Sequence, residues 1–358
     1  MTILHKYWFK EFFTFFFIIH LIVQFIFVAV DFFSRMDKFL ESEIALGQAF
    51  EYIILKVPFM FVETTPAVVV LSVIVVFGLM NRNNELTAVR SSGVSIYHLL
   101  KPAAFAGFLL SILMMFFSET VVPVTMSKAN YIKYTVIKGH GSIHKSRKDI
   151  WIKQDEKICH VNYFNPADKT VSGLTVSVLD KRFSLISRID AEKGYYQNGT
   201  WHLSNVIEQQ YDKERDDYGV KCRESMVFDI GLAPADFQNI AKKSEEMSLF
   251  ELSDYINKVE AEGYDATTYR VDFYAKIAFP FICFLMAVAG TAIGMRPMVK
   301  KNLAAGVGAG ILMSFFYWIV YSFCVSLGYG KILSPFISAW AANFVFLTMC
   351  VINLLNTE

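Results

Sequence analysis

The chain has 358 residues, of which 54% are hydrophobic and 34 are phenylalanine, and this composition is too apolar for an ordinary soluble protein. Its formal net charge of +1 gives no reason to expect nucleic acid or a strongly acidic protein as a partner. The apolar residues are gathered in long runs, so the sequence predicts a membrane protein.

Six of these runs are long enough to cross about 30 Å of hydrocarbon as helices. Three come before a long polar block and three come after it. The first run is too long for the core of a signal peptide, and no small-residue cleavage site follows it, so we expect a retained helix. The predicted spans cover residues 12–33, 57–80, 103–122, 274–295, 303–327 and 332–355.

Basic residues in the short loops predict the orientation of the helices. Lysine and arginine are more frequent before the first span and after the second and fourth spans than in the loops on the other side. Since these residues favour the cytoplasmic side, we expect both termini to be cytoplasmic and the polar block to be exported. The more basic side carries Lys6, Lys10, Arg82, Arg90, Lys101, Arg296, Lys300 and Lys301.

The polar block carries β signals between residues 150 and 228. The runs ICHVNYF, LTVSVLD and RFSLISRID roughly alternate apolar and polar residues, and Asn198-Gly199 between two further runs is a strong hairpin signal. Short strands at this spacing predict an antiparallel sandwich, a jelly roll or an open barrel, with the strand order left open. Cys159 and Cys222 lie in this block and could form a disulfide.

A helix is predicted where the polar block returns to the membrane. Ser248 and Glu251 have the spacing of a capping box, Leu252 and Ile256 belong to an apolar face, and Gly263 suits the C-terminal end. We therefore expect a first transmembrane half at 1–129, a β domain at 130–247, a connecting helix at 248–271 and a second transmembrane half at 272–358.

Four ionisable residues lie in the predicted spans near their outer ends: Asp31, Glu63, Glu119 and Lys276. Because charges are costly in hydrocarbon, each of them reaches the interface, pairs with a neighbour or serves a function. A proton or ion relay would place charges near the middle of the membrane, where these spans have almost none. His20 and Gln24 share a face of the first span and are expected to serve packing and hydrogen bonding.

The sequence contains none of the familiar motifs of catalysis or nucleotide binding. A glycine-rich phosphate loop, an HExxH motif and a Gly-x-Ser-x-Gly motif are all missing. We therefore expect no catalytic residue, no metal site and no cofactor bound by this chain.

The peptide NRNNELTAVRSSGVS, residues 81–95, separates the second and third spans. Asn84 is suited to cap a short helix that begins near Glu85, because an acid is favourable at the positive end of a helix dipole, and Gly93 is suited to end that helix. These residues alone leave two interpretations open, a plain connector or a surface to which another protein binds.

The order of these features resembles the LptF/LptG family of lipopolysaccharide export permeases. Three spans, an exported β domain and three further spans follow one another, with NELTAVRSSGVS after the second span. The similarity covers essentially the whole chain, and the chain looks closer to the LptG branch than to the LptF branch. The matching segments also include DIWIKQDEKICHVNYF, VSVLDKRFSLISRIDA, GTWHLSNV and YINKVEAEGYDATTYRVDFYAKIAFP.

The resemblance implies a polytopic α-helical protein of the bacterial inner membrane, with six transmembrane helices and an inserted periplasmic antiparallel domain like a β-jellyroll. It implies the permease subunit of an ATP-driven ABC transporter. With an LptF-type permease, the chain would enclose a cavity that faces the outer leaflet and extracts lipopolysaccharide. The lipid would then pass to a periplasmic β-jellyroll bridge of LptA type, toward the outer membrane.

Further partners follow from the same resemblance. A dimer of an LptB-type ATPase would bind ATP and magnesium, and an LptC-type regulator with a single span would join the complex. The peptide at about 84–93 would be the coupling helix that docks in the ATPase. Its residues would be Glu85 as a charged anchor, Leu86 and Val89 as apolar contacts, Arg90 at the periphery and Gly93 at the end.

Basic residues just beyond the first and third spans match the places where the family contacts lipid phosphates. These rim candidates are Arg35, Lys38, Lys128 and Lys133. Asp31 departs from the family pattern, because an acid repels phosphate. Either Arg35 takes over the contact, or Asp31 pairs with it.

Apolar residues of the first and fifth spans are candidates for the cavity lining or a lateral gate, with lipid exposure or helix packing as the alternative. These candidates are Phe27, Asp31, Phe32, Phe315, Phe316 and Trp318. A second functional reading is a membrane scaffold that transports nothing and recruits an envelope partner through its β domain. A secondary carrier is disfavoured, because charges at mid-membrane and broken helices are lacking.

Overall fold

The computed structural model describes residues 3–41, 46–93, 95–133, 148–154, 156–165, 169–180, 184–197, 199–212, 217–232, 234, 243–261, 263 and 265–355. Within these residues, 6 helices are long and apolar enough to cross a membrane, which confirms the predicted spans. Most of the helices continue beyond the apolar run that predicted them. They are α1 (Ile3–Glu41), α2 (Leu46–Arg82), α4 (Ile96–Ile132), α7 (Thr267–Gly294), α9 (Leu303–Tyr329) and α10 (Pro335–Leu355).

Helices α2 and α7 form the centre of the bundle. Ile74 and Phe77 of α2 are fully buried, and so is Ile282 of α7. Two glycines of α7 let the helices approach closely: a Cβ atom on Gly290 would lie 3.0 Å from the backbone oxygen of Val70, and one on Gly294 would lie 2.8 Å from Cβ of Phe77. Small residues at such contacts are typical of membrane helices, whose association depends on close packing.

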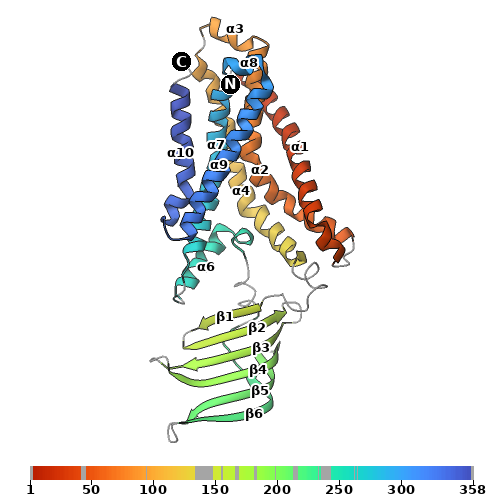
Figure 1. The fold of residues 1–358 in the computed structure, drawn as a ribbon, viewed down its shortest axis with the longest axis vertical. Helices are drawn as coiled ribbons and strands as arrows, with labels where there is room; N and C mark the ends of the chain where they lie inside the picture. The colour runs from red at the N-terminus through yellow and green to blue at the C-terminus, as the bar shows by residue number, and fades with distance from the viewer. Residues whose placement is uncertain are drawn as a thin grey trace.

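The two ends of the bundle differ in what they carry (Figure 1). The short helices α3 (Glu85–Ser91) and α8 (Pro297–Lys301) lie at the same end as both chain termini. The β sheet lies beyond the opposite end, which we call the sheet-side end; the other is the far end. This arrangement agrees with a chain whose termini share one side and whose inserted sheet lies on the other.

The inserted segment forms one six-stranded antiparallel sheet, and its strands follow one another in sequence order. This confirms the predicted antiparallel domain and supplies the strand order. Cys159 lies in its apolar core while Cys222 is exposed, and both are free thiols. The strands are β1 (Lys148–Gln154), β2 (Lys157–Asn165), β3 (Thr170–Leu179), β4 (Leu185–Gln197), β5 (Thr200–Asp212) and β6 (Asp217–Phe228).

A row of irregular positions crosses the sheet at one level. On β5, the buried side chains are Trp201 and Leu203 but then Val206, so one extra residue shifts the alternation. The pairing skips residues at the same level on β2 to β6, and two of these, Gly173 and Asn205, have φ angles of 65° and 51°. Both strands of each pair skip one residue, so the register is kept, and the skipped positions are aligned across the sheet. The skipped residues are Asn162, Gly173, Glu192, Asn205 and Glu224.

The chain returns to the bundle through a 3-10 turn, η2 (Ser244–Glu246), and helix α6 (Leu249–Ala261). The predicted capping box is confirmed: the Ser248 amide donates to the Glu251 carboxylate at 3.0 Å, and the Glu251 amide donates to Ser248 Oγ at 3.2 Å. Leu252 and Ile256 are buried, as the apolar pattern predicts.

Substitution of Gly107 by alanine tests the close packing of the bundle. A Cβ atom there would lie 2.7 Å from Cβ of Ala287 and 3.0 Å from the Cys283 carbonyl oxygen, so α4 and α7 would have to separate. We expect Gly107→Ala to lower the unfolding free energy by about 1–3 kcal/mol, the usual cost of overpacking.

Gly308→Ala on α9 is the matched control, because a Cβ atom there meets nothing within 4 Å. Thermal unfolding of the full-length protein in detergent measures both effects. Equal melting temperatures for the two variants would contradict the packing that we describe.

Candidate functional site

The far end of the bundle presents α3 between α2 and α4. Its first residue, Glu85, accepts long hydrogen bonds from Tyr7 Oη at 3.5 Å and from Asn83 Nδ2 at 3.4 Å. Asn84 and Gly93, on either side of the helix, have φ angles of 63° and 80°, so the chain turns sharply at both ends. The peptide is thus a defined short helix, as its sequence predicts.

The apolar residues of α3 hold it to the bundle. Leu86 is only 3% exposed and belongs to the main hydrophobic core, and Val89 packs against that core. The prediction that Leu86 offers an apolar contact to a partner is not tested by this chain alone, in which the protein itself covers the Leu86 side chain. Thr87, Ala88 and Ser91 are exposed instead. The side chain of Arg90 lies outside the described residues.

The sheet-side ends of α1, α2 and α4 converge around a small apolar cluster. Phe39 of α1, Tyr52 of α2 and Ala129 of α4 belong to it. The cluster brings the predicted rim residues of spans 1 and 3 to one region: Lys128 is exposed on α4, and Lys133 is half-buried at its end. Lys38, also predicted there, has a side chain outside the described residues.

Arg35 and Asp31 do pair, which is one of the two expected outcomes. Arg35 Nε lies 3.0 Å from Asp31 Oδ1, one helical turn away. A third residue, Lys56 of α2, lies 2.7 Å from both oxygens of the same carboxylate. The sequence reasoning missed Lys56, since nothing in the local pattern connects it with Asp31.

The gate candidates divide into exposed and packed residues. Phe27 of α1 is 50% exposed, and Phe315 and Phe316 of α9 are 66% and 47% exposed. Phe32, by contrast, packs against the cluster around Phe39 and Tyr52. Trp318 packs against Phe279 and Tyr321 inside the bundle.

A pocket of about 540 Å³ opens at the sheet-side end between α2, α4, α7 and α9. Phe59, Phe279 and Trp318 contribute apolar walls, while Glu63 and Lys276, both noted in the sequence as ionisable residues within spans, contribute charge. The pocket combines apolar surface with a few polar groups, which is typical of ligand sites. Its charges are of mixed sign and do not define a ligand.

The returning segment 244–249 is tied to three helices by polar contacts. Asn130 Nδ2 of α4 donates to Glu246 Oε1 at 2.6 Å, and Glu119 of α4 accepts from the Leu249 amide at 2.5 Å. Asp272 of α7 accepts from Ser244 Oγ and from Tyr329 Oη of α9, and Lys276 donates to the Met247 carbonyl. This segment, which we call the clasp, is therefore fixed against the bundle at the point where the chain returns to it.

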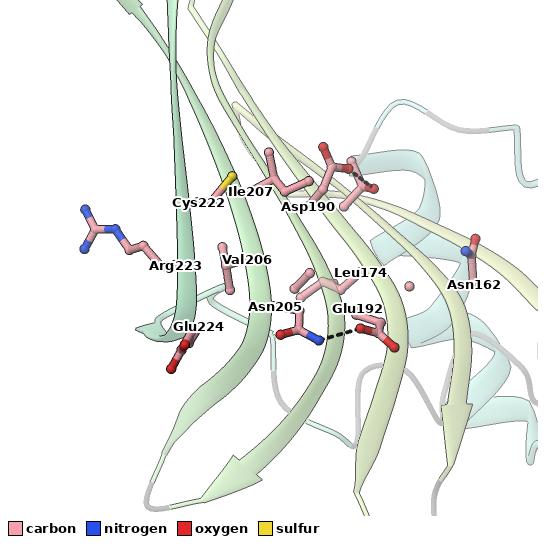
Figure 2. A pocket seen from close by; sticks show the side chains of 13 residues that line it. Asn162, Leu174, Asp190, Glu192, Asn205, Val206, Ile207, Cys222, Arg223 and Glu224 are labelled. Atoms are coloured by element: carbon pink, nitrogen blue, oxygen red, sulfur yellow. Dashed lines mark hydrogen bonds between the residues drawn. The ribbon is translucent and has the colours of Figure 1, made fainter.

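A hollow of about 660 Å³ lies on the sheet at the row of skipped residues. Figure 2 shows the strands curving there, with Asn205 donating to Glu192 and Thr175 donating to Asp190. Both acids are thus engaged by neighbours. Across the part of the chain that the structure describes, no group of three or more His, Cys, Asp or Glu side chains could hold a metal ion.

Comparison with known proteins agrees with this architecture. The family model described as "Lipopolysaccharide export system permease LptF/LptG" matches residues 6–356. The chain belongs to the LptF/LptG family. The LptG permease protein of Escherichia coli (strain K12) is 20% identical over 283 residues, which are 77% of this chain and 76% of that protein. The LptG permease protein of Haemophilus influenzae is 20% identical over 296 residues, which are 80% of this chain and 82% of that protein.

The family assignment confirms the resemblance read from the sequence motifs. It makes the chain an inner-membrane permease of the lipopolysaccharide export type. Within an LptF/LptG chain, the features described above occupy two opposite ends: α3 at the far end, and the basic cluster, pocket and clasp at the sheet-side end.

The clasp is tested by Asn130→Ala. Burial raises the pKa of Glu246, and the Asn130 amide opposes this rise by stabilising the carboxylate. Without the amide, the folded-state pKa rises further above its unfolded value, so the stability lost grows as the pH increases through that range. We expect a loss of about 1–3 kcal/mol at pH 8 and a smaller loss at pH 5.

Thermal unfolding of the full-length protein at the two pH values measures the effect, with the exposed Asn257→Ala of α6 as the control. A loss that is identical at both pH values would mean that Asn130 does not act through the Glu246 charge.

Proposed function

We propose that this LptF/LptG chain is the LptG-type half of an ATP-driven lipopolysaccharide exporter. It pairs with an LptF-type permease, and the two halves enclose a cavity that takes lipopolysaccharide from the outer leaflet. An LptB-type ATPase dimer, which binds ATP and magnesium, drives the cycle. An LptC-type regulator and an LptA-type bridge carry the lipid onward from the periplasmic β domain.

The match of the family model across residues 6–356 is the observation on which the proposal rests. The basic loops at the far end support a cytoplasmic location for α3 and both termini, and hence a periplasmic location for the sheet. Arg296, Lys300 and Lys301, near α8, add basic exposed side chains to that end.

The construction of α3 supports a role as the coupling helix. Because Leu86 and Val89 fix it to the core of the bundle, a force on α3 would move α2 and α4 with it. Glu85 lies at the start of the helix with only long hydrogen bonds from its neighbours, so its carboxylate remains available to a basic group of the ATPase. The docking surface is therefore Glu85 with the exposed polar residues of α3.

Apolar surface on α1 and α9 supports a lipid path. Phe25 and Phe27 of α1, and Leu312, Phe315 and Ile319 of α9, are at least half exposed. Transfer of acyl chains into water costs about 0.8 kcal/mol per CH₂ group, so a lipid with several chains needs such a surface throughout its passage. ATP hydrolysis then has to supply only the smaller difference in free energy between the lipid in the bilayer and the lipid in the cavity.

Glu85→Ala tests the coupling role. Loss of one partner of an interfacial ion pair costs about 2 kcal/mol or more, so we expect the affinity for the ATPase dimer to fall by about 30-fold or more. Copurification with the ATPase, and ATP-dependent lipid release from proteoliposomes, measure the result.

Glu51→Ala, an exposed acid at the sheet-side end of α2, is the control and should change neither quantity. Unchanged copurification and release with Glu85→Ala would refute the docking role. Copurification without any lipid release by the wild-type complex would favour the scaffold alternative.

Photocrosslinking groups placed at Phe27 and Phe315 test the lipid path. Both side chains are exposed on the helices proposed to line the cavity, so we expect covalent adducts with lipopolysaccharide that decrease when ATP is hydrolysed. A group at Phe250, which is 82% exposed on α6, is the control. Adducts of equal intensity at all three positions would show non-specific lipid exposure instead of a path.

A further inference from the structure

The Asp31 carboxylate lies between two cationic donors, Lys56 and Arg35, at the sheet-side end. Asp31 of α1 receives two hydrogen bonds of 2.7 Å from Lys56 Nζ and one of 3.0 Å from Arg35 Nε. The side chains of Asp31, Lys56 and Arg35 are only 15%, 11% and 28% exposed. The aromatic ring of Tyr52 lies below both cations, each 5.6 Å from its centroid.

This arrangement is the one by which proteins hold an anionic oxygen. Charge-assisted hydrogen bonds of 2.7–2.9 Å from Lys and Arg recognise carboxylate and phosphate alike. Tyr52 restricts both cations by cation–π contact, so the two donors remain in place when the anion changes. The structure therefore contains a formed anion site whose occupant is part of the chain.

We propose that Asp31 is an internal competitor that selects lipids bearing a phosphate monoester. In the resting chain its carboxylate occupies Lys56 and Arg35, and a phosphate monoester headgroup displaces it. This inference rests on the proposed function, since it concerns how the lipid is recognised at the rim. It assigns Lys56 as a phosphate contact beside Arg35, and Asp31 as the residue that determines selectivity.

The charge of the headgroup decides the competition. A phosphate monoester carries about −1.5 to −2 charges near neutral pH, whereas the phosphate diester of an ordinary phospholipid carries one. A diester with one negative charge gains no more from the two cations than the Asp31 carboxylate already does. Unlike that carboxylate, the diester is not tethered to the site, so it competes less well. Specificity of this kind depends on a repulsive or competing element as well as on attractive contacts. Asp31 supplies that element against the most abundant membrane lipids.

The exchange also affects α1. Among the described residues, the Asp31–Lys56 bridge is the one ion pair that joins α1 to α2, and a 3.4 Å hydrogen bond from Gln24 to the Val57 carbonyl adds a weaker polar link. When phosphate replaces the carboxylate, the direct bridge from Asp31 of α1 to Lys56 of α2 becomes a longer one, in which the phosphate lies between Arg35 of α1 and Lys56. Capture of the headgroup thereby loosens the sheet-side end of α1, the helix with the least buried apolar stretch of the six.

Asp31→Asn tests the competitor, because it keeps the shape of the side chain and removes the charge. Native mass spectrometry of the full-length protein counts bound dioleoyl phosphatidic acid, a monoester, and dioleoyl phosphatidylglycerol, a diester. The comparison is made at the lipid concentration at which the wild type binds the monoester but not the diester. We expect Asp31→Asn to lose this preference and bind the diester as well, because removal of the competitor raises the apparent affinity for both lipids by roughly tenfold, the scale of one charge-assisted hydrogen bond. Asp31→Glu should retain the preference.

Asp37→Asn is the matched control, since Asp37 is an exposed acid on the same helix, and it should leave the preference unchanged. If Asp31→Asn keeps the wild-type preference, the competitor role is refuted while the proposed lipid rim stands. If the wild type binds neither lipid, or binds them regardless of Arg35→Gln and Lys56→Gln, the rim itself fails, and the competitor with it.

A measurement on the unmodified site covers the case in which Asp31→Asn does not fold. Spin labels at the exposed positions Phe33 of α1 and Ile54 of α2 report the separation of the two helices. We expect phosphatidic acid, but not phosphatidylglycerol, to lengthen this distance. Equal distances with both lipids would overturn the displacement of Asp31.

Discussion

The close approach of α2 to α7 and α9 is the constraint on which the rest of the bundle depends. Gly290 and Gly294 of α7 place their backbone against α2, and Gly310 of α9 lies where a Cβ atom would be 2.7 Å from Cδ1 of Ile74. Within a bilayer, lipid tails are as apolar as leucine, so helices associate through such packing and not through a hydrophobic drive between them. Helix α2 is consequently central to the packing of the bundle, and its two ends carry the two proposed working regions, α3 at one end and Lys56 at the other.

Helix α1 is held differently along its length. Only 11% of its most apolar stretch is buried, against 78% for α7, and Phe25, Phe27 and Phe33 are at least half exposed. Trp8, Phe12 and Phe16 anchor its far-end half in the main core. The sheet-side half is attached to α2 by the aromatic cluster around Phe39 and Tyr52, the Gln24 hydrogen bond and the Asp31–Lys56 bridge. This half can move without unfolding the main core, which is what a lateral opening for lipid requires.

Much of this could be read from the sequence, because the deciding signals are local. Apolar length predicts the spans, Asn198-Gly199 predicts the hairpin at which Gln197 pairs with Thr200, and the Ser248–Glu251 spacing predicts the cap. Local signals could not predict the pairing of Lys56 with Asp31, the burial of Leu86 or the row of skipped residues in the sheet. Lys56 is 25 residues from Asp31 on another helix, and Leu86 is covered by residues from several helices. The shift in the alternation of buried side chains on a single strand shows its significance only when strand pairing places the shifts of all the strands at one level.

The clasp fixes the point at which the chain returns to the bundle from the sheet. Asn130 and Glu246 are 6% and 9% exposed, and a buried polar pair of this kind holds one geometry, since breaking it leaves a buried group without a partner. Asp272 accepts hydrogen bonds from Ser244 and Tyr329 at a second point. Helices α4 and α7 therefore contact the clasp directly, and α9 is linked to it through Asp272. A change in the spacing of these helices must therefore either rotate the clasp as a unit or break a buried contact.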